Sequence, residues 1–101
     1  MKTDRYDADE ADLLAMFSSI ESPEEARDFL LDLCTPSEIR TFVERWKVCR
    51  LLSRGTFSYR DIKKLTGASL TTIGRVARFL KDEPYGGYRR MLQKIGMEES
   101  K

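Results

Sequence analysis

Small, hydroxyl-bearing and cationic side chains cluster between residues 69 and 78, where their types and spacing suit the binding of a polyanion. The run contains Ser69, Thr71, Thr72, Gly74, Arg75 and Arg78. Hydroxyl and guanidinium groups donate hydrogen bonds to phosphate or guanine, and small side chains let a helix approach base edges closely. Three further cations precede the run at Arg60, Lys63 and Lys64. Together these residues predict a nucleic-acid-binding surface.

The sequence offers little for catalysis or metal binding. It contains no histidine, the commonest general base and transition-metal ligand in proteins. The two cysteines, Cys34 and Cys49, lie among apolar residues at helical spacing, so we expect buried free thiols and no disulfide or zinc site. No nucleophile, base and orienting group stand in a recognisable arrangement. We therefore expect neither an enzyme nor a bound metal or cofactor.

The two parts of the chain carry opposite charge. Residues 1–35 contain three Lys or Arg against ten Asp or Glu, whereas residues 36–101 contain fifteen against seven. This split indicates a basic surface for a polyanion and an acidic surface turned away from it, although solvated charged faces would give a similar composition. No apolar run approaches the roughly 18 residues that a membrane span needs, and the acidic first ten residues lack the apolar core of an export signal. We expect a cytoplasmic protein without a membrane partner.

Apolar residues recur at three- and four-residue spacing, whereas period-two alternation never persists. This pattern predicts an all-α fold. Six helices are expected, at about residues 9–20, 23–33, 36–54, 59–65, 70–81 and 88–95, with residues 66–69 forming a tight turn between the fourth and the fifth. Capping sequences mark several of their starts, namely Ser22-Pro23, Thr35-Pro36 and Ser58. Residues 96–101 are expected to fray.

Residues 58–81 match the plan of a helix-turn-helix, whose second helix enters the DNA major groove. Ile62 and Ile73 would meet between the crossing helices, and Gly67 would let the chain reverse. Leu65 is expected on the buried edge with Ile62, and Val76 would anchor the second helix. The predicted DNA-binding residues are Arg60, Lys63, Lys64, Gly67, Ala68, Ser69, Leu70, Thr71, Thr72, Gly74 and Arg78. A plain helical hairpin with a solvated basic face is the structural alternative.

The remaining apolar stripes belong to the core or to a subunit interface. Helix 36–54 carries Ile39, Phe42, Val43, Trp46, Cys49 and Leu52 at helical spacing. Phe42 and Trp46 are expected to be core or dimer-interface residues. The last helix offers Met91, Leu92 and Ile95 for packing. A chain of 101 residues buries only a modest core alone, so a partner subunit would help.

Short motifs between Thr35 and Leu80 carry a family resemblance. They are Thr35-Pro36-x-Glu38, Arg54-Gly55, Ser58-x-Arg60, Gly67-Ala68 and Thr72-Ile73-x-Arg75. With this spacing the chain resembles the tryptophan repressor superfamily, and in particular its YerC/YecD-like branch. The resemblance implies an intertwined homodimer in which the N-terminal helices of one subunit pack around those of the other. It also implies that Arg60 reads a guanine, that Leu70 and Thr71 approach base edges, and that Lys63 and Thr72 bind phosphate.

The same resemblance points to an effector site. In the tryptophan repressor the indole of the corepressor lies between two arginines, and Arg45 and Arg75 match those positions. The implied effector-binding residues are Thr35, Arg45, Thr72, Arg75, Val76 and Phe79. The member that binds tryptophan has glycine and serine where this chain has Val76 and Phe79, and this bulk argues against tryptophan. Another planar or anionic metabolite, or pairing of the arginines with acids, remains open.

The sequence therefore predicts a single helical DNA-binding domain over residues 1–101, with acidic dimerisation helices in residues 1–35. The predicted function is that of a sequence-specific transcriptional regulator that binds double-stranded DNA as a homodimer. The alternative is a protein–protein interaction module whose basic helices are only solvated.

Overall fold

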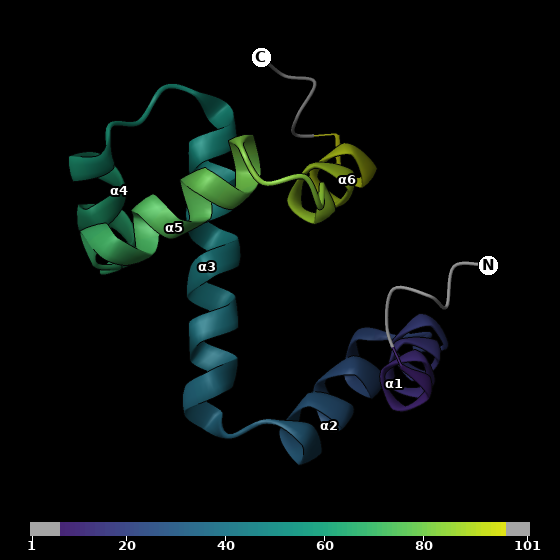
Figure 1. The fold of residues 1–101 in the computed structure, drawn as a ribbon. Coiled ribbons are helices and arrows are strands. Elements are labelled where there is room, and N and C mark those ends of the chain that lie inside the picture. Colours follow the sequence, from purple (N-terminus) through teal and green to yellow (C-terminus); the bar gives the residue numbers. More distant parts are fainter. Residues whose placement is uncertain (1–6, 97–101) are drawn as a thin grey trace. The chain divides into compact units, whose positions relative to one another are not determined.

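A computed structural model of the chain describes residues 7–96, which form six helices and no strand (Figure 1). The helices are α1 (Ala8–Ser18), α2 (Pro23–Leu33), α3 (Pro36–Arg54), α4 (Tyr59–Thr66), α5 (Leu70–Lys81) and α6 (Gly87–Lys94). The all-α prediction and the order of its helices are confirmed. None of these helices is both long and apolar enough to cross a membrane. The frayed end predicted for residues 96–101 falls, beyond Gly96, outside the described residues.

The first helix ends earlier than the sequence pattern predicts. The hydroxyl of Ser18 donates to the carbonyl oxygen of Leu14 at 2.9 Å, and the hydroxyl of Ser19 donates to that of Met16 at 2.7 Å. The Met16 carbonyl also accepts from Ser19 N–H at 3.0 Å, and the Phe17 carbonyl accepts from Ile20 N–H at 3.3 Å, so the last turn tightens into the three-residue spacing of a helix end. α1 therefore ends at Ser18 and does not reach Ile20.

The chain divides into two compact units, Met1–Ile39 and Arg40–Lys101. The first unit holds α1, α2 and the beginning of α3. No residue of α1 or α2 is buried, and the rings of Phe17 and Phe29 pack together with their centroids 5.3 Å apart. Large apolar side chains stay exposed on both helices, at Leu13, Leu14, Met16, Phe17, Leu31 and Leu33. Residues 7–39 therefore present apolar surface and contain no buried residue.

Side-chain caps fix the helix starts in the first unit. Asp7 caps α1 and Ser22 caps α2. At the start of α3, Glu38 N–H donates to Thr35 Oγ1 at 3.1 Å, and Thr35 N–H donates to Glu38 Oε1 at 2.8 Å. This reciprocal pair is a capping box, which satisfies two backbone donors that the helix leaves free.

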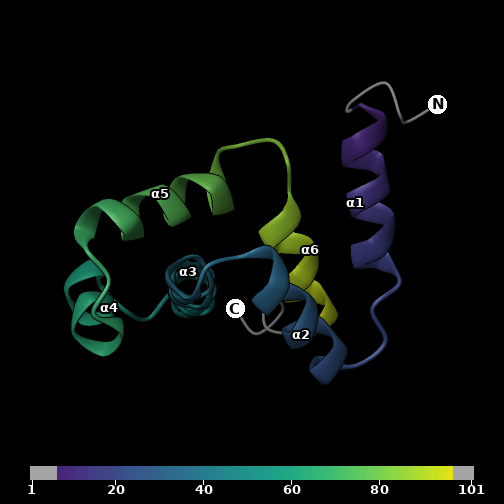
Figure 2. The same ribbon diagram turned by 90° about the horizontal axis from the view of Figure 1, so that it is seen from below.

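The second unit is organised around one buried cluster. In both views α5 crosses α3, while α4 and α6 lie on opposite sides of α3 (Figures 1 and 2). The cluster contains Val48 and Cys49 of α3, Ile62 of α4, Ala68, Ile73, Val76 and Leu80 of α5 and its preceding turn, and Leu92 of α6. Burial raises the pKa of the Cys49 thiol to about 12, so this cysteine is a packed thiol.

Several apolar residues predicted to pack are exposed. Leu65 is 54% exposed, because Ile62 and Thr66 take the inner positions of α4 and the Thr66 hydroxyl bonds to the Ile62 carbonyl. On α6 only Leu92 is buried, whereas Met91 and Ile95 stay about half exposed. A helix of 8 residues presents few positions to one neighbour. Phe42, predicted as a core or dimer-interface residue, is 46% exposed in the single chain, Val43 is 60% exposed, and Cys34 is half-buried.

Two glycines provide a matched test of the turn between α4 and α5. Gly67 has φ +78° and Gly74 lies inside α5, and a Cβ at either position would meet nothing within 4 Å. Gly67→Ala should therefore lower the free energy of unfolding by about 1 kcal/mol through backbone strain alone. Gly74→Ala should raise it by about 0.5–1 kcal/mol, because glycine is a poor residue inside a helix. Urea unfolding of both variants measures the difference, and equal effects would contradict the left-handed turn.

Candidate nucleic-acid interface

A three-residue turn, Gly67 to Ser69, joins α4 to α5. It is one residue shorter than the predicted turn of residues 66–69, because Thr66 still belongs to α4. Gly67 adopts the left-handed conformation and its N–H donates to the Lys63 carbonyl at 2.8 Å, which closes α4. The Thr66 hydroxyl then accepts from Ala68 N–H at 3.0 Å while it donates to the Ile62 carbonyl at 2.7 Å. The turn is thus held by its own hydrogen bonds, and it sets the crossing of the two helices.

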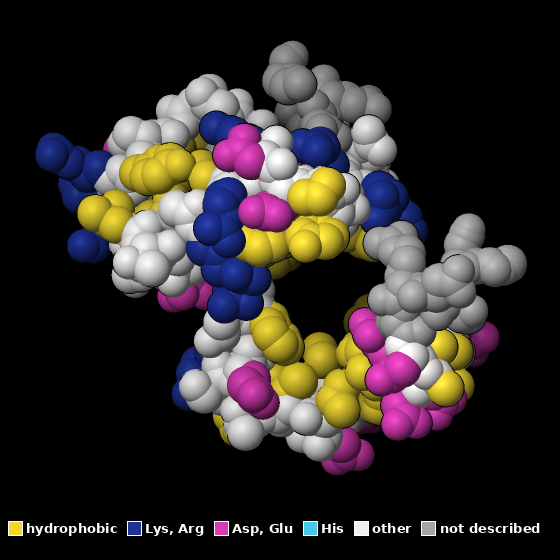
Figure 3. All heavy atoms as spheres, in the orientation of Figure 1, with side chains coloured by type: hydrophobic (Ala, Val, Ile, Leu, Met, Phe, Trp, Pro, Cys, Tyr) yellow, Lys and Arg dark blue, Asp and Glu magenta, His cyan; other side chains and the backbone are white. Residues whose placement is uncertain are grey.

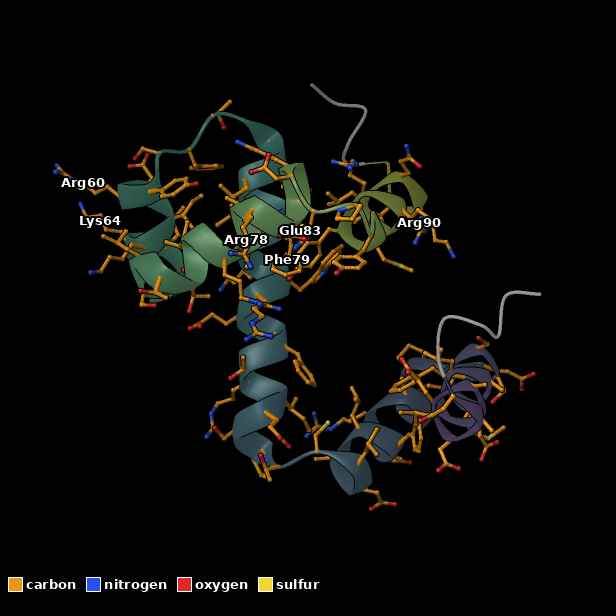
Figure 4. All side chains as sticks on the ribbon, in the orientation of Figure 1. Arg60, Lys64, Arg78, Phe79, Glu83 and Arg90 are labelled. Carbon is orange, nitrogen blue, oxygen red and sulfur yellow. The ribbon has the colours of Figure 1, made fainter. Side chains whose placement is uncertain are left out.

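A capping box fixes the first turn of α4, where Arg60 lies. Asp61 N–H donates to Ser58 Oγ at 3.0 Å, and Ser58 N–H donates to Asp61 Oδ2 at 3.1 Å. The hydrogen bond from the Ser58 backbone, followed by that from its side chain, holds the pKa of the Asp61 carboxyl below its usual value. The neighbouring Arg60 stays exposed, and its side chain extends away from the helix (Figure 4).

The N-terminus of α5 presents a low, polar end to solvent. Ser69 caps the helix by accepting from Thr72 N–H at 3.1 Å, and its hydroxyl also bonds to Thr72 Oγ1 at 3.2 Å. Leu70 is 54% exposed and Thr71 is exposed beside it. The positive end of the helix dipole adds to the attraction for an anion at this point.

Exposed cations surround this end of the second unit. Lys and Arg side chains gather at the free edge of α4 and over the crossing of α3 and α5 (Figure 3). Arg78 on α5 forms an ion pair with Glu83 at 3.3 Å, and its guanidinium lies 5.0 Å from the Phe79 ring centroid (Figure 4). An exposed ion pair contributes little to stability, so a phosphate can compete with Glu83 for Arg78.

The structure sorts the predicted DNA-binding residues by exposure. Those that face solvent are Arg60, Lys63, Lys64, Gly67, Ser69, Leu70, Thr71 and Arg78, and those that are half-buried are Thr72 and Gly74. Ala68 is only 1% exposed and belongs to the buried cluster, so its side chain cannot contact DNA. A small residue is needed there because the turn passes directly over the core. Sequence reasoning missed Tyr59, which is 43% exposed beside Arg60; its place in the first turn of α4 was the available signal.

A second feature of this unit is an aromatic cavity of about 420 Å³. Its walls are Trp46, Arg75, Phe79, Tyr85, Gly86, Gly87, Tyr88 and Met91. The connection from α5 to α6 is fixed by hydrogen bonds from Arg89 to the Leu80 carbonyl at 2.6 Å and from Arg90 to the Tyr85 carbonyl at 3.1 Å. The name aromatic cavity is used for this cavity of eight lining residues.

Only some of the predicted effector-binding residues line the aromatic cavity. Arg75 and Phe79 do so, and the Arg75 guanidinium rests 4.4 Å from the centroid of the Phe79 ring. Val76 is 1% exposed and is a core residue, so it cannot contact a ligand there. Two other predicted residues of this unit, Arg45 and Thr72, are not among the lining residues, and Thr35 belongs to the Met1–Ile39 unit.

Arg45 nevertheless influences one lining residue, because its charge affects the pKa of Tyr88. Burial raises the pKa of the Tyr88 hydroxyl, and the charges of Arg45 and Arg75 oppose this shift. Tyr88 and Trp46 pack with their ring centroids 6.4 Å apart, and the rings of Phe79 and Tyr85 stack at 6.2 Å. Sequence reasoning missed Tyr85 and Tyr88, because nothing in their spacing links the α5–α6 connection to α3.

Among residues 7–96, no three His, Cys, Asp or Glu side chains lie close enough to hold a metal ion.

The Asp61 cap predicts a pH-dependent contribution to stability. Because the pKa of Asp61 is lower in the folded chain than in the unfolded chain, its contribution is present at neutral pH. It is lost as the pH falls from about 4 through the folded-state pKa. Asp61→Asn should therefore lower the melting temperature at pH 7, and the difference should shrink in acid. A difference in melting temperature that is the same at pH 3 and pH 7 would contradict this role, and Ser58→Ala should reduce the effect of the substitution.

Known proteins are similar to this chain over nearly all of its described residues. The Trp repressor protein family matches residues 9–95. YerC of Bacillus subtilis (strain 168), whose function is uncharacterised, is 36% identical over 103 residues, which cover 99% of this chain and 95% of that protein.

Two solved structures share the fold. A TrpR-like protein from Eubacterium eligens ATCC 27750 superimposes with a TM-score of 0.80 at 37% identity, covering 86% of this chain and 88% of the other. A protein from Staphylococcus aureus, provisionally described as a Trp repressor, has a TM-score of 0.86 at 29% identity and covers 97% of both chains. Sequence and fold thus agree over nearly the same residues, and the chain belongs to the Trp repressor family.

Proposed function

We propose that the protein is a sequence-specific DNA-binding regulator of transcription that uses α4 and α5 as a helix-turn-helix. The proposal is carried by one observation: the exposed N-terminus of α5 combines Leu70 and Thr71 with a capped, positive helix end, beside the exposed cations of α4. A helix end of this shape and charge suits the major groove. Membership of the Trp repressor family supports the same function.

Each exposed residue then has a role set by its chemistry. Arg60 would donate two hydrogen bonds to a guanine, and Leu70 would contact a thymine methyl. Thr71 would approach a base edge. The phosphate contacts would come from Lys63, Lys64, Thr72 and Arg78. Such a regulator would act in the cytoplasm of a bacterial cell.

We also propose that the protein works as a homodimer. The apolar side chains of α1 and α2 are exposed within one chain, and no residue of these helices is buried. Apolar surface of this kind is stabilised when a second subunit covers it. A dimer would also present two copies of α5 to successive major grooves.

An effector site is the remaining part of the proposal. The aromatic cavity offers ring faces and one guanidinium, which suit a planar or anionic metabolite. Tryptophan is disfavoured, because Phe79 already lies against the Arg75 guanidinium.

Selection of bound sequences from random duplex DNA tests the main proposal. On the selected site, Arg60→Ala should cost about 1–3 kcal/mol and relax the preference at one base pair. Lys63→Ala should weaken binding to all sequences, and it should reduce the slope of log K against log salt by about 0.9. Lys94→Ala on α6 is the matched control and should change neither property. No enriched sequence, together with recovery of a protein partner, would favour the interaction-module alternative.

Analytical ultracentrifugation tests the homodimer. Leu31 is 45% exposed on α2, so Leu31→Glu would place a charge in the proposed interface. It should weaken dimerisation by at least about tenfold, a loss of about 1.4 kcal/mol. Glu24→Gln on the same helix changes an exposed polar residue and should leave dimerisation unchanged. A wild-type chain that remains monomeric at all concentrations would refute the homodimer.

A further inference from the structure

A second cavity in the Arg40–Lys101 unit has no role in the proposed DNA contacts. It has a volume of about 330 Å³ and is lined by Lys47, Arg50, Leu51 and Arg54 of α3 and by Leu65 of α4. We call it the basic cavity. Three of its five lining residues are cations and none is an acid.

The cations of the basic cavity lack acidic partners. Positions 47, 50 and 54 are three and four residues apart, so they share one face of α3. Among the described residues, none of the three forms an ion pair. The Arg50 Nε atom is buried and has no hydrogen-bond acceptor. Like charges on one helix face and an unsatisfied donor both cost stability, which an anion in the cavity would offset.

We propose that the basic cavity binds a small organic phosphate that carries two or more phosphate charges. Arginine presents a planar fork of donors that matches phosphate oxygens, and Lys47 adds a point charge. The side chains of Leu51 and Leu65 would pack against the organic part of the ligand. The volume lies at the lower end of the range for small-molecule sites, which is more room than a single phosphate needs.

The direction of Leu65 separates this site from the proposed DNA contacts. Lys63 and Leu65 are two residues apart on α4, so their directions differ by about 200° around the helix axis. Lys64, the other proposed phosphate contact on α4, lies about 100° from Leu65 around the axis, so a duplex that contacts Lys63 and Lys64 leaves the flank with Leu65 open. The inference does not rest on DNA binding, and the two proposals can fail separately.

Isothermal titration calorimetry of the full chain with ADP, and with inorganic pyrophosphate, tests the site. We expect saturable binding of one ADP per chain at constant ionic strength. Arg50→Gln should weaken it by at least about tenfold, because it removes a charge-assisted contact. Arg54→Gln, at an exposed position, should weaken it as well. The matched control is Arg40→Gln on the same helix, about 15 Å from Arg50 along the axis, which should leave binding within about twofold.

Several results would overturn the proposal. Failure of both ADP and pyrophosphate to saturate would do so, as would equal losses in the Arg50 and Arg40 variants. If Arg50→Gln instead lowers the salt slope of duplex binding by about 0.9 and ADP does not bind, the phosphate belongs to the DNA backbone.

Thermal unfolding distinguishes a ligand-binding role of Arg50 from a purely structural one. Arg50→Met removes the unsatisfied donor and one of three like charges, so the variant without ligand should melt no lower than the wild type. ADP should raise the melting temperature of the wild type clearly more than that of Arg50→Met. Equal shifts in both proteins would overturn the site.

Discussion

The burial of Ile62 and Ile73 in one cluster with α3 is the contact on which the rest of the second unit depends. Both side chains are fully buried, so neither α4 nor α5 can rotate without exposing apolar surface to water. A helix has a fixed period, and the buried stripe of α5 therefore determines which of its residues point outward. The outward position of Thr71 and Arg78 is thus a consequence of core packing.

Local hydrogen bonds fix the ends of the helices that the core holds in place. Ser58 and Ser69 fix where α4 and α5 start, and Gly67 fixes where α4 ends. Because these starts are defined to the residue, Arg60 lies in the first turn of α4 and Leu70 at the first position of α5. The capped end of α5 also carries the positive end of its dipole, so the same geometry that stops the helix favours an anion beside it.

Most cations of the second unit form no ion pair among the described residues. The described residues contain one ion pair, Arg78 with Glu83, although cations crowd α3, α4 and α5. Unpaired like charges repel one another and lower stability. The arginines of the two cavities differ in the partners of their guanidinium groups. Arg75 rests on the Phe79 ring in the aromatic cavity, whereas Arg50 in the basic cavity keeps a buried donor without an acceptor.

Short-range spacing and local hydrogen bonds were enough to predict the order of the helices, several of their caps and the inner face of α5. Ile62, Ile73 and Val76 are buried as predicted, and the ends of α5 are those expected. The burial of residues at the edges of the apolar stripes depended on tertiary packing. Leu65 and Ile95 are exposed, and Ala68 of the turn is buried. Tertiary packing also decided which distant residues meet, as Tyr88 and Trp46 do at the aromatic cavity. Helical periodicity gives the direction of a side chain from its own axis, but only the packing of one helix on another determines what lies in that direction.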